Sequence, residues 1–469
     1  MNITSVDFLF FITIISLLFF MVPAKIQWLY LLICSYYFYS FAGISGLLFL
    51  AGSTFITWCG AIGISKISNE KKGLRRFLFF TVLCLTLLVL IIPKYFAPEG
   101  FTIPLGISFY VFMSVSYLAD VYLGKTEAEK NPFKYALFTG FYPLLSQGPI
   151  CRYNTLSAEF EKKHVFSLEN IGVGITRISY GYFKKLMIAD KIGVLVTSVT
   201  DVSDVYNGAW FFLTLIAYTI QLYMDFSGGI DITIGTAKLI GITLPENFMQ
   251  PLFSRSIGEF WRRWHITMGS WFRDYIYIPL GGNRVSKFRL IINLFVVWLA
   301  TGIWHGKGLN YIVWGLCNFV ILALSRIFDS PIKKFHEKTK LDKNPIYIVF
   351  QIIRTYLLAA CFFTLFCYPT LTAAFSGFTS MFTAGNWNIF VDGSLLTMGL
   401  GISDYIIIGA GLILVFFVSL IKELKKEKLF IQFPFAIKAF GVMLIIFSVL
   451  IFGSYGKGYD ASAFIYNRF

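Results

Sequence analysis

Long apolar runs recur along the whole of this sequence, and they constrain its fold more than any other feature. Inside a bilayer every backbone N–H and C=O needs a partner within the protein, which the α-helix supplies along its own length. A helix crosses the hydrocarbon core with about 20 apolar residues. The sequence therefore predicts an all-α integral membrane protein with roughly ten to twelve spanning helices, formed by the runs near 7–23, 27–43, 45–64, 77–95, 101–122, 134–150, 208–224, 290–304, 309–325, 346–368, 405–421 and 434–453.

The composition agrees with a membrane protein and argues against nucleic-acid binding. Hydrophobic residues make up 57% of the chain and charged residues 14%, compared with about 25% charged residues in soluble domains. The net charge is +15, but the Lys and Arg residues fall in short links between apolar runs, as the positive-inside rule requires. We expect contacts with membrane lipid and none with nucleic acid.

Neither the N-terminal run nor the cysteines and histidines suggest processing or metal binding. The first run starts at Asp7 without a preceding cationic region and without a small-residue cleavage pattern, so we expect it to remain as a helix. The seven Cys residues have no metal-ligand or redox spacing. The four His residues form no helical pair, so the sequence predicts no metal site.

The distribution of basic residues predicts the topology. Segment 326–343 carries six Lys or Arg residues and 422–438 carries five, whereas 371–405 carries none. The two basic segments should be cytoplasmic and 371–405 should face outward. The tail 454–469 then emerges on the outer face, and the Arg-rich, aromatic segment 255–289 lies on the cytoplasmic side, partly as amphipathic helix.

His305 is an ionisable residue inside an apolar segment, WLATGIWHGKGLNYIVW at 298–314. The uncharged run 290–304 rises only about 22 Å as a helix, short of the roughly 30 Å hydrocarbon thickness. His305 should therefore lie within the membrane, where an imidazole is a candidate functional group. A packed histidine bonded to a backbone carbonyl is the alternative.

Several blocks together resemble the membrane-bound O-acyltransferase (MBOAT) family. They are QLYMDFSGGIDITIGTAKLIGITLPENFMQPLFSRSIGEFWRRWHITMGSWFRDYIYIPLGGNR at 221–284, the GIWHG around His305, and the segments 104–122, 140–153 and 452–469. The likeness is strongest to the bacterial branch that moves acyl groups onto envelope polysaccharides, including the membrane subunits of alginate and peptidoglycan O-acetylation. It implies a ring of tilted helices around a tunnel, with cytoplasmic amphipathic or re-entrant helices.

The resemblance assigns His305 as the catalytic histidine and His265 as a second polar residue that assists it. A neutral imidazole can take a proton from an attacking hydroxyl while a thioester donor is held in line, which is worth about 10²- to 10⁴-fold in rate. His265 lies between Trp264 and Ile266, so interfacial packing is its alternative role.

A further set of polar residues is interpreted as contacting the acyl donor or substrate. The arginines and Asp274 could instead form ion pairs or contact lipid phosphates. The two carboxylates in the apolar run could line a watery tunnel or bond helix to helix, and Asn247 could orient a donor or a loop. The set comprises Asn247, Arg262, Arg263, Arg273, Asp274, Asp225 and Asp231.

The C-terminal tail ends in Phe-Ile-Tyr-Asn-Arg-Phe, which resembles a tail that relays acyl groups in this branch. Tyr466 would accept the acyl group and present it on the outer side. A phenol with a pKa near 10 needs a base to become a nucleophile, which gives His305 a role. The alternative is a hydrophobic plug or docking peptide.

Together these observations predict one integral membrane acyltransferase domain over 1–469, with a catalytic core segment at 221–310 and an extracytoplasmic relay tail at 454–469. The expected reaction moves an acyl group, acetyl above all, from cytoplasmic acetyl-CoA or an acyl carrier protein toward an envelope polysaccharide, at the bacterial cell membrane and without a tightly bound cofactor. Since the chain lacks a hydrolase-like motif, we expect an extracytoplasmic SGNH/GDSL-type acetyltransferase or esterase-like partner.

Three alternatives remain open at this point. D-alanyl transfer to teichoic acid is the nearest within the enzyme class. A transporter or channel would use the intramembrane Asp225, Asp231 and His305 to line a substrate path. A non-catalytic docking scaffold would keep the tail but tolerate loss of His305.

Overall fold

The computed structural model describes residues 1–469 except 99, 203–204, 426–433, 457–458, 460–463 and 465–469. Over these residues the chain is helical, and its β-structure is confined to a single bridge between Phe248 and Trp264. The chain forms two compact units. The first comprises Met1–Gly181, Gly229–Glu246 and Asp460–Arg468, and the second comprises Tyr182–Gly228, Asn247–Tyr459 and Phe469.

The first unit is built mainly from the N-terminal helices. Its elements are α1 (Val6–Phe19), α2 (Gln27–Ser40), α3 (Ile44–Lys66), α4 (Lys72–Ile91), α5 (Ile107–Tyr122), α6 (Pro132–Gly140), α7 (Leu144–Gln147), α8 (Tyr153–Glu161) and α9 (Leu168–Tyr182). Helix α3 packs against α4 and α5. At the α3–α4 contact, a Cβ on Gly60 would lie 2.7 Å from Val82 Cγ2, so a small residue permits the close approach.

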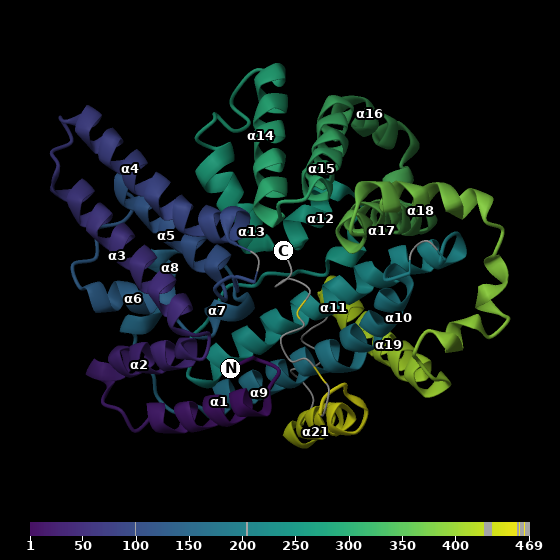
Figure 1. Cartoon of the computed structure of the whole chain (residues 1–469), viewed down its shortest axis with the longest axis horizontal. Helices are drawn as coiled ribbons and strands as arrows, with labels where there is room; N and C mark the ends of the chain where they lie inside the picture. Colours follow the sequence, from purple (N-terminus) through teal and green to yellow (C-terminus); the bar gives the residue numbers. More distant parts are fainter. Residues whose placement is uncertain (99, 203–204, 426–433, 457–458, 460–463, 465–469) are drawn as a thin grey trace. The chain divides into compact units, whose positions relative to one another are not determined.

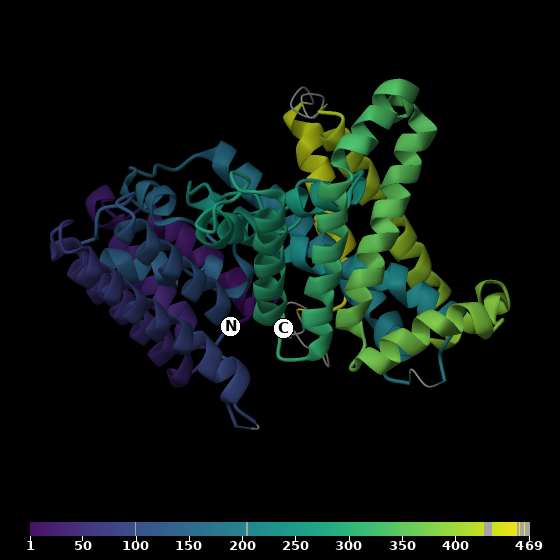
Figure 2. The ribbon, with the colours of Figure 1, turned by 90° about the horizontal axis from the view of Figure 1, so that it is seen from above.

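The second unit contains a π-helical segment, Phe183–Ala189, and most of the remaining helices. They are α10 (Asp190–Thr200), α12 (Ile257–Arg263), α13 (Ile266–Phe272), α14 (Lys287–His305), α15 (Leu309–Ile327), α16 (Asp329–Thr339), α17 (Pro345–Cys367), α18 (Leu371–Thr383), α19 (Ile402–Glu423) and α21 (Phe435–Phe452). Helices α14 and α15 run side by side as a hairpin (Figure 2). The long helix α11 (Ala209–Leu239) contributes residues to both units.

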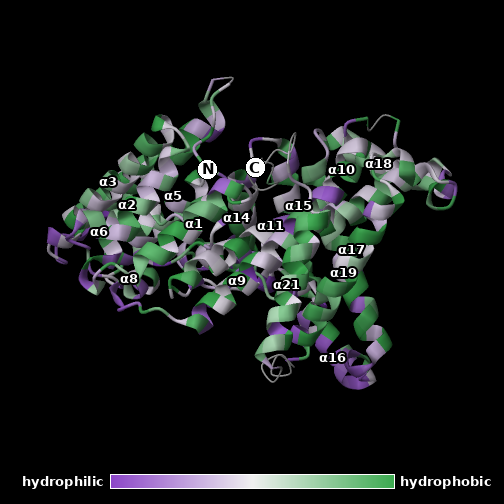
Figure 3. Ribbon diagram, turned by 90° about the horizontal axis from the view of Figure 1, so that it is seen from below, coloured by the Kyte–Doolittle hydropathy of each residue, from purple (hydrophilic) through white to green (hydrophobic). Residues whose placement is uncertain are grey.

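Eight helices among the described residues are long and apolar enough to cross a membrane. They are α3, α4 with its π-helical end, α11, α14, α15, α17, α19 and α21, and α1 and α5 are shorter apolar helices. Figure 3 shows green, apolar ribbon along α17 and α19 and purple, hydrophilic ribbon at α16. The protein is thus an all-α, multi-pass membrane protein, as the apolar runs predict.

Two predicted spans are not among these helices. The run at 27–43 forms α2, which has 14 residues, and the run at 134–150 takes a different form. The run at 134–150 forms the short helices α6 and α7, which end at Gly140 and Gln147. Pro143 directly precedes α7 and cannot donate a backbone hydrogen bond. The nine residues of α6 rise only about 14 Å, and most of the run is buried among other helices of the first unit.

Candidate active site

The loop before α13 gives His265 an unusual backbone. His265 has φ 45° and ψ 53° and precedes the first residue of the helix. This left-handed conformation is uncommon for residues other than glycine, although histidine adopts it more readily than most. The loop is fixed by two backbone hydrogen bonds, from Ile266 N to Asn247 O at 3.0 Å and from Met249 N to Arg263 O at 2.9 Å.

The side chain of Asn247 determines the protonation pattern of His265. Its Oδ1 accepts hydrogen bonds from Thr267 N at 3.0 Å and Thr267 Oγ1 at 2.9 Å, which identifies this atom as the oxygen. His265 Nδ1 lies 3.2 Å from the same oxygen, so Nδ1 carries the proton and Nε2 is the acceptor. Asn247 thus orients the loop and its histidine.

Burial keeps His265 neutral. The residue is 1% exposed, and desolvation lowers its pKa to about 3. Its ring packs edge-on against Phe226, with centroids 4.9 Å apart. A histidine that holds a proton so weakly is a poor general base, which suits His265 to positioning rather than proton transfer.

His305 ends α14 inside a cluster of aromatic rings. Its ring centroid lies 4.7 Å from that of Trp304, 4.8 Å from Trp314 on α15 and 5.3 Å from Phe366 on α17. The residue is 6% exposed. Three helices of the second unit thus hold this imidazole in largely apolar surroundings.

Glycines allow the backbone approach that creates this cluster. A Cβ on Gly302 would lie 2.6 Å from Tyr311 O, and one on Gly315 would collide with Trp298 O. Helices α14 and α15 can therefore pack with their backbones almost in contact. Asn310 Nδ2 donates to Leu365 O at 3.0 Å, which ties the start of α15 to α17.

The rings of His265 and His305 both lie near the ring of Trp304. The ring of Trp304 lies 6.3 Å from that of His265 and 4.7 Å from that of His305. Helix α12 joins the same assembly, because Trp261 Nε1 donates to Asn318 Oδ1 on α15 at 2.8 Å. The structure therefore brings together the two histidines that the sequence singles out.

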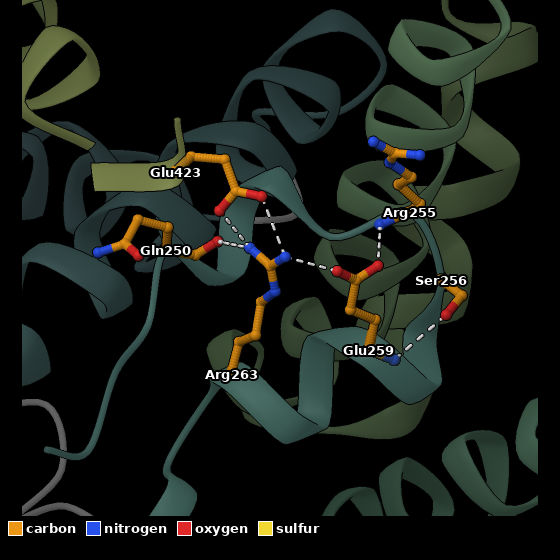
Figure 4. A network of polar contacts seen from close by, with 6 residues as sticks. All are labelled: Gln250, Arg255, Ser256, Glu259, Arg263 and Glu423. Carbon is orange, nitrogen blue, oxygen red and sulfur yellow. Dashed lines mark hydrogen bonds and ion pairs between the residues drawn. The ribbon is translucent and has the colours of Figure 1, made fainter. Parts of the chain in front are cut away.

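The arginines of the predicted donor set differ in their surroundings, and Figure 4 shows those of Arg263. Arg263 lies 2.6 Å from Glu259 Oε1 and 2.5 Å from Glu423 Oε2, and its Nη1 also reaches Gln250 O at 3.4 Å. Glu259 in turn accepts from Arg255 N at 2.9 Å. This network joins α12 to α19, so Arg263 has a clear structural role.

The other two arginines of the set are more accessible. Arg262 is exposed. Arg273 is exposed and pairs with Asp274, with its Nε 2.8 Å from Asp274 Oδ1. These side chains lie on α12 and the π-helical turn after α13, where charged ligands or lipid phosphates can reach them.

Asp225 and Asp231 on α11 are both bound by cations. In the second unit, Asp225 Oδ1 lies 2.6 Å from Lys185 Nζ. In the first unit, Asp231 Oδ1 lies 2.7 Å from Arg177 Nε, and Arg177 also binds Glu246 at 2.5 Å. The sequence analysis singled out the aspartates but missed Lys185 and Arg177.

A signal for the missed residues was present in the sequence. Lys184 and Lys185 lie in a largely apolar stretch, YFKKLMIAD at 182–190, which ends in Asp190. Charged residues in such stretches normally pair with one another, so two lysines and an aspartate of a nearby run were candidate partners. Their identity depends on helix packing, which spacing does not reveal.

The predicted acyl relay has no described geometry. Tyr466 lies outside the described residues. Within the described part of the chain, no group of three or more His, Cys, Asp or Glu residues could hold a metal ion.

The fold and the site define a multi-pass membrane protein with a buried histidine at the turn of a helical hairpin, and the comparisons identify its family. A sequence model of MBOAT, the membrane-bound O-acyltransferase family, matches residues 31–368. The chain is 36% identical over 394 residues to the probable alginate O-acetylase AlgI of Azotobacter vinelandii, covering 79% of this chain and 76% of the relative. The chain therefore belongs to the membrane-bound O-acyltransferase family and is an acyltransferase.

Other relatives carry related activities. The peptidoglycan O-acetyltransferase of Helicobacter pylori is 32% identical, with 66% of each chain covered. The teichoic acid D-alanyltransferase of Bacillus subtilis is 28% identical, with 49% of this chain and 61% of the relative covered. The higher identities and longer coverage belong to the two O-acetyltransferases.

Proposed function

We propose that this protein moves an acetyl group from a cytoplasmic thioester to the outer face of a bacterial cell membrane, for O-acetylation of an envelope polysaccharide. The observation that carries the proposal is His305, held by three helices beside the ring that also contacts His265. The names of the relatives supply the acyl group and the class of acceptor. The donor is acetyl-CoA or an acetyl-loaded carrier protein.

In this proposal His305 acts as the general base. It takes the phenolic proton of Tyr466 while the phenolate oxygen bonds to the acetyl carbonyl carbon. The carbon–sulfur bond then breaks, and the thiolate leaves with the proton that His305 returns. A hydroxyl nucleophile of an extracytoplasmic SGNH/GDSL-type partner then attacks the acetyl carbonyl carbon of the Tyr466 ester. The bond from that carbon to the phenolic oxygen breaks, the phenol of Tyr466 takes up the proton of the attacking hydroxyl, and the partner passes the acetyl group to a polysaccharide hydroxyl.

His265 and the surface cations have supporting roles. Neutral His265, fixed by Asn247, positions Trp304 and through it His305. Arg262, Arg273 and Asp274 lie where they can meet a phosphate-bearing donor, whereas Arg263, Asp225 and Asp231 hold the fold through their ion pairs.

The test is acetyl transfer by the purified full-length protein in detergent. The protein is incubated with radiolabelled acetyl-CoA, and the label is located by mass spectrometry. His305→Ala should lower the rate of labelling by at least 10²-fold, and Tyr466→Phe should remove label from the C-terminal peptide. His336→Ala on the hydrophilic helix α16 is the matched control and should label normally. Labelling unaffected by either of the first two changes would refute the mechanism.

D-alanyl transfer is the second candidate, because one relative is a teichoic acid D-alanyltransferase. The same assay with a D-alanyl thioester discriminates between them. Faster labelling from that donor than from acetyl-CoA and an acetyl carrier protein would favour the second candidate.

A further inference from the structure

A buried ionic cluster lies where the π-helical segment Phe183–Ala189 meets α10 and α11. Lys185 Nζ lies 2.7 Å from Asp190 Oδ1 and 2.6 Å from Asp225 Oδ1. The side chains of Lys185 and Asp225 are each 1% exposed. Next to them, Lys184 Nζ donates to Ser227 Oγ at 2.8 Å. All these groups belong to the second unit.

The C-terminal segment reaches this cluster. Helix α21 ends at Phe452, and Ser454 N then donates to Leu186 O at 3.0 Å. Five residues later, the hydroxyl of Tyr459 donates to Asp190 Oδ2 at 2.9 Å. Asp190 is thus bound through one oxygen by Lys185 and through the other by Tyr459.

The chemistry of the cluster makes Asp190 a strong acceptor. Asp190 contacts the ammonium group of Lys185 through Oδ1, and its Oδ2 accepts a hydrogen bond from the hydroxyl of Tyr459. Hydrogen bonds to ionised acceptors are about twice as strong as neutral ones, and burial strengthens them further. The contact of Tyr459 with Asp190 is therefore suited to holding a segment of chain in place.

We propose that Tyr459 is a clasp, which fixes the C-terminal segment to the buried Lys185–Asp190–Asp225 cluster and limits how far the chain beyond it can reach. The consequence for acyl transfer rests on the proposed function, in which Tyr466 accepts the acyl group. Tyr459 and Asp190 are then positioning residues for Tyr466, and neither touches the reacting atoms.

Chain geometry gives the size of the effect. Twelve residues separate Ser454 from Tyr466, which at full extension allows about 42 Å, whereas the seven residues from Tyr459 allow about 25 Å. The effective concentration of a tethered group falls roughly as the −3/2 power of tether length. Where Tyr459 is the last attached residue, the clasp therefore raises the effective concentration of Tyr466 by about twofold.

Phe464 provides an independent second attachment, within the first unit. Its side chain is 1% exposed, and its Cε1 lies 3.4 Å from the place that a Cβ on Gly229 would occupy. Gln147 Oε1 occupies the same space, and a Cβ there would collide with it. Phe464, five positions beyond Tyr459, is thus also buried within the protein.

Limited proteolysis tests the clasp without any acyl donor. Lys457 is the last lysine of the chain, so endoproteinase Lys-C can release only 458–469 as a C-terminal peptide. Cleavage of a transiently opened site tracks its open population. Tyr459→Phe removes one oxygen atom and should speed release by about tenfold, the effect of one hydrogen bond to a charged group. The rate is normalised to cleavage after the exposed Lys340.

Two controls separate the clasp from general destabilisation. Tyr455→Phe removes the same atom from a half-exposed tyrosine of the same segment, whose hydroxyl donates to Leu450 O in the last turn of α21 rather than to Asp190. This variant should leave the release rate unchanged. Asp190→Asn should speed release as Tyr459→Phe does, and the double variant should release no faster than either one. Equal release from wild type and Tyr459→Phe, or fully additive effects in the double variant, would overturn the clasp.

A single-turnover assay tests the positioning role. In a Phe464→Ala background, adding Tyr459→Phe should lower acetylation of Tyr466 a further twofold, with the pH profile unchanged because the base is untouched. Adding Tyr455→Phe to the same background should leave the acetylation of Tyr466 unchanged. An equal rate with and without Tyr459→Phe would refute positioning, whereas protection from Lys-C without any acetylation would leave the clasp standing and refute the proposed function.

Discussion

Replacing His265 with asparagine removes a buried imidazole and keeps a residue that tolerates the same backbone. The site has φ 45°, in the left-handed region where asparagine is favoured. Burial lowers the pKa of His265 to about 3, whereas an unfolded chain gives about 6.5. Between these values the unfolded state binds more protons, so the wild-type protein loses stability as the pH falls from 6.5 toward 3.

The size of this loss of stability is set by the one proton that the imidazole of His265 binds on unfolding. The free energy of unfolding changes by at most about 1.4 kcal/mol per pH unit. At pH 4.5, two units below the unfolded pKa, His265 lowers the stability of the wild type by about 2.7 kcal/mol relative to pH 7.5. His265→Asn has no such loss, so its deficit against the wild type should shrink by about this amount at pH 4.5.

The assay is unfolding of both proteins in detergent from pH 4.5 to 7.5, followed by tryptophan fluorescence. Gly409→Ala on α19 is the control, because it changes no titratable group and has open space around it. Its stability relative to the wild type should be the same at every pH. Parallel stability curves for wild type and His265→Asn would refute the argument from burial.

Three further predictions concern the packing and charge of the helices. Gly302→Ala places a Cβ 2.6 Å from Tyr311 O, so it should lower the free energy of unfolding by about 1–3 kcal/mol and also lower the rate of acyl transfer. Gly409→Ala on α19 has open space around it and should lower neither quantity in the same assays. Arg177→Met leaves the carboxylate of Asp231, which is 7% exposed, without its cation, and should lower the free energy of unfolding by about 3 kcal/mol. Arg263→Gln should lower the free energy of unfolding by about 1 kcal/mol or less, because the ion pairs of Arg263 are partly exposed. Arg262→Gln should leave the free energy of unfolding unchanged and raise the KM for the acyl donor.

The sequence predicted the membrane helices well because length and apolarity are local properties. It placed spans at 290–304 and 309–325, and the structure has α14 and α15 there. The run 134–150 shows the limit of this reasoning. Its residues are apolar because they are buried in protein, and apolarity alone does not distinguish a protein interior from lipid.

The candidate site was predictable in its residues and not in its surroundings. The glycines and the apolar run around His305 identified the residue, and the resemblance added His265. Trp314 and Phe366 come to His305 from two other helices, which no local pattern encodes. The contact of both histidines with Trp304 likewise depends on how α12, α13 and α14 pack.

Helix α11 shows why intramembrane carboxylates need not mark a transport path. Asp225 and Asp231 lie six residues apart on one helix, yet each binds a cation of a different unit. A carboxylate that carries a substrate or proton must release its partner during each cycle, and breaking a buried pair costs about 3–5 kcal/mol. An acyltransferase does not need to break and re-form these ion pairs in each cycle. In such an enzyme the two ion pairs can hold α11 to the segments that carry the two cations. The ion pairs of α11 therefore fit a rigid enzyme scaffold.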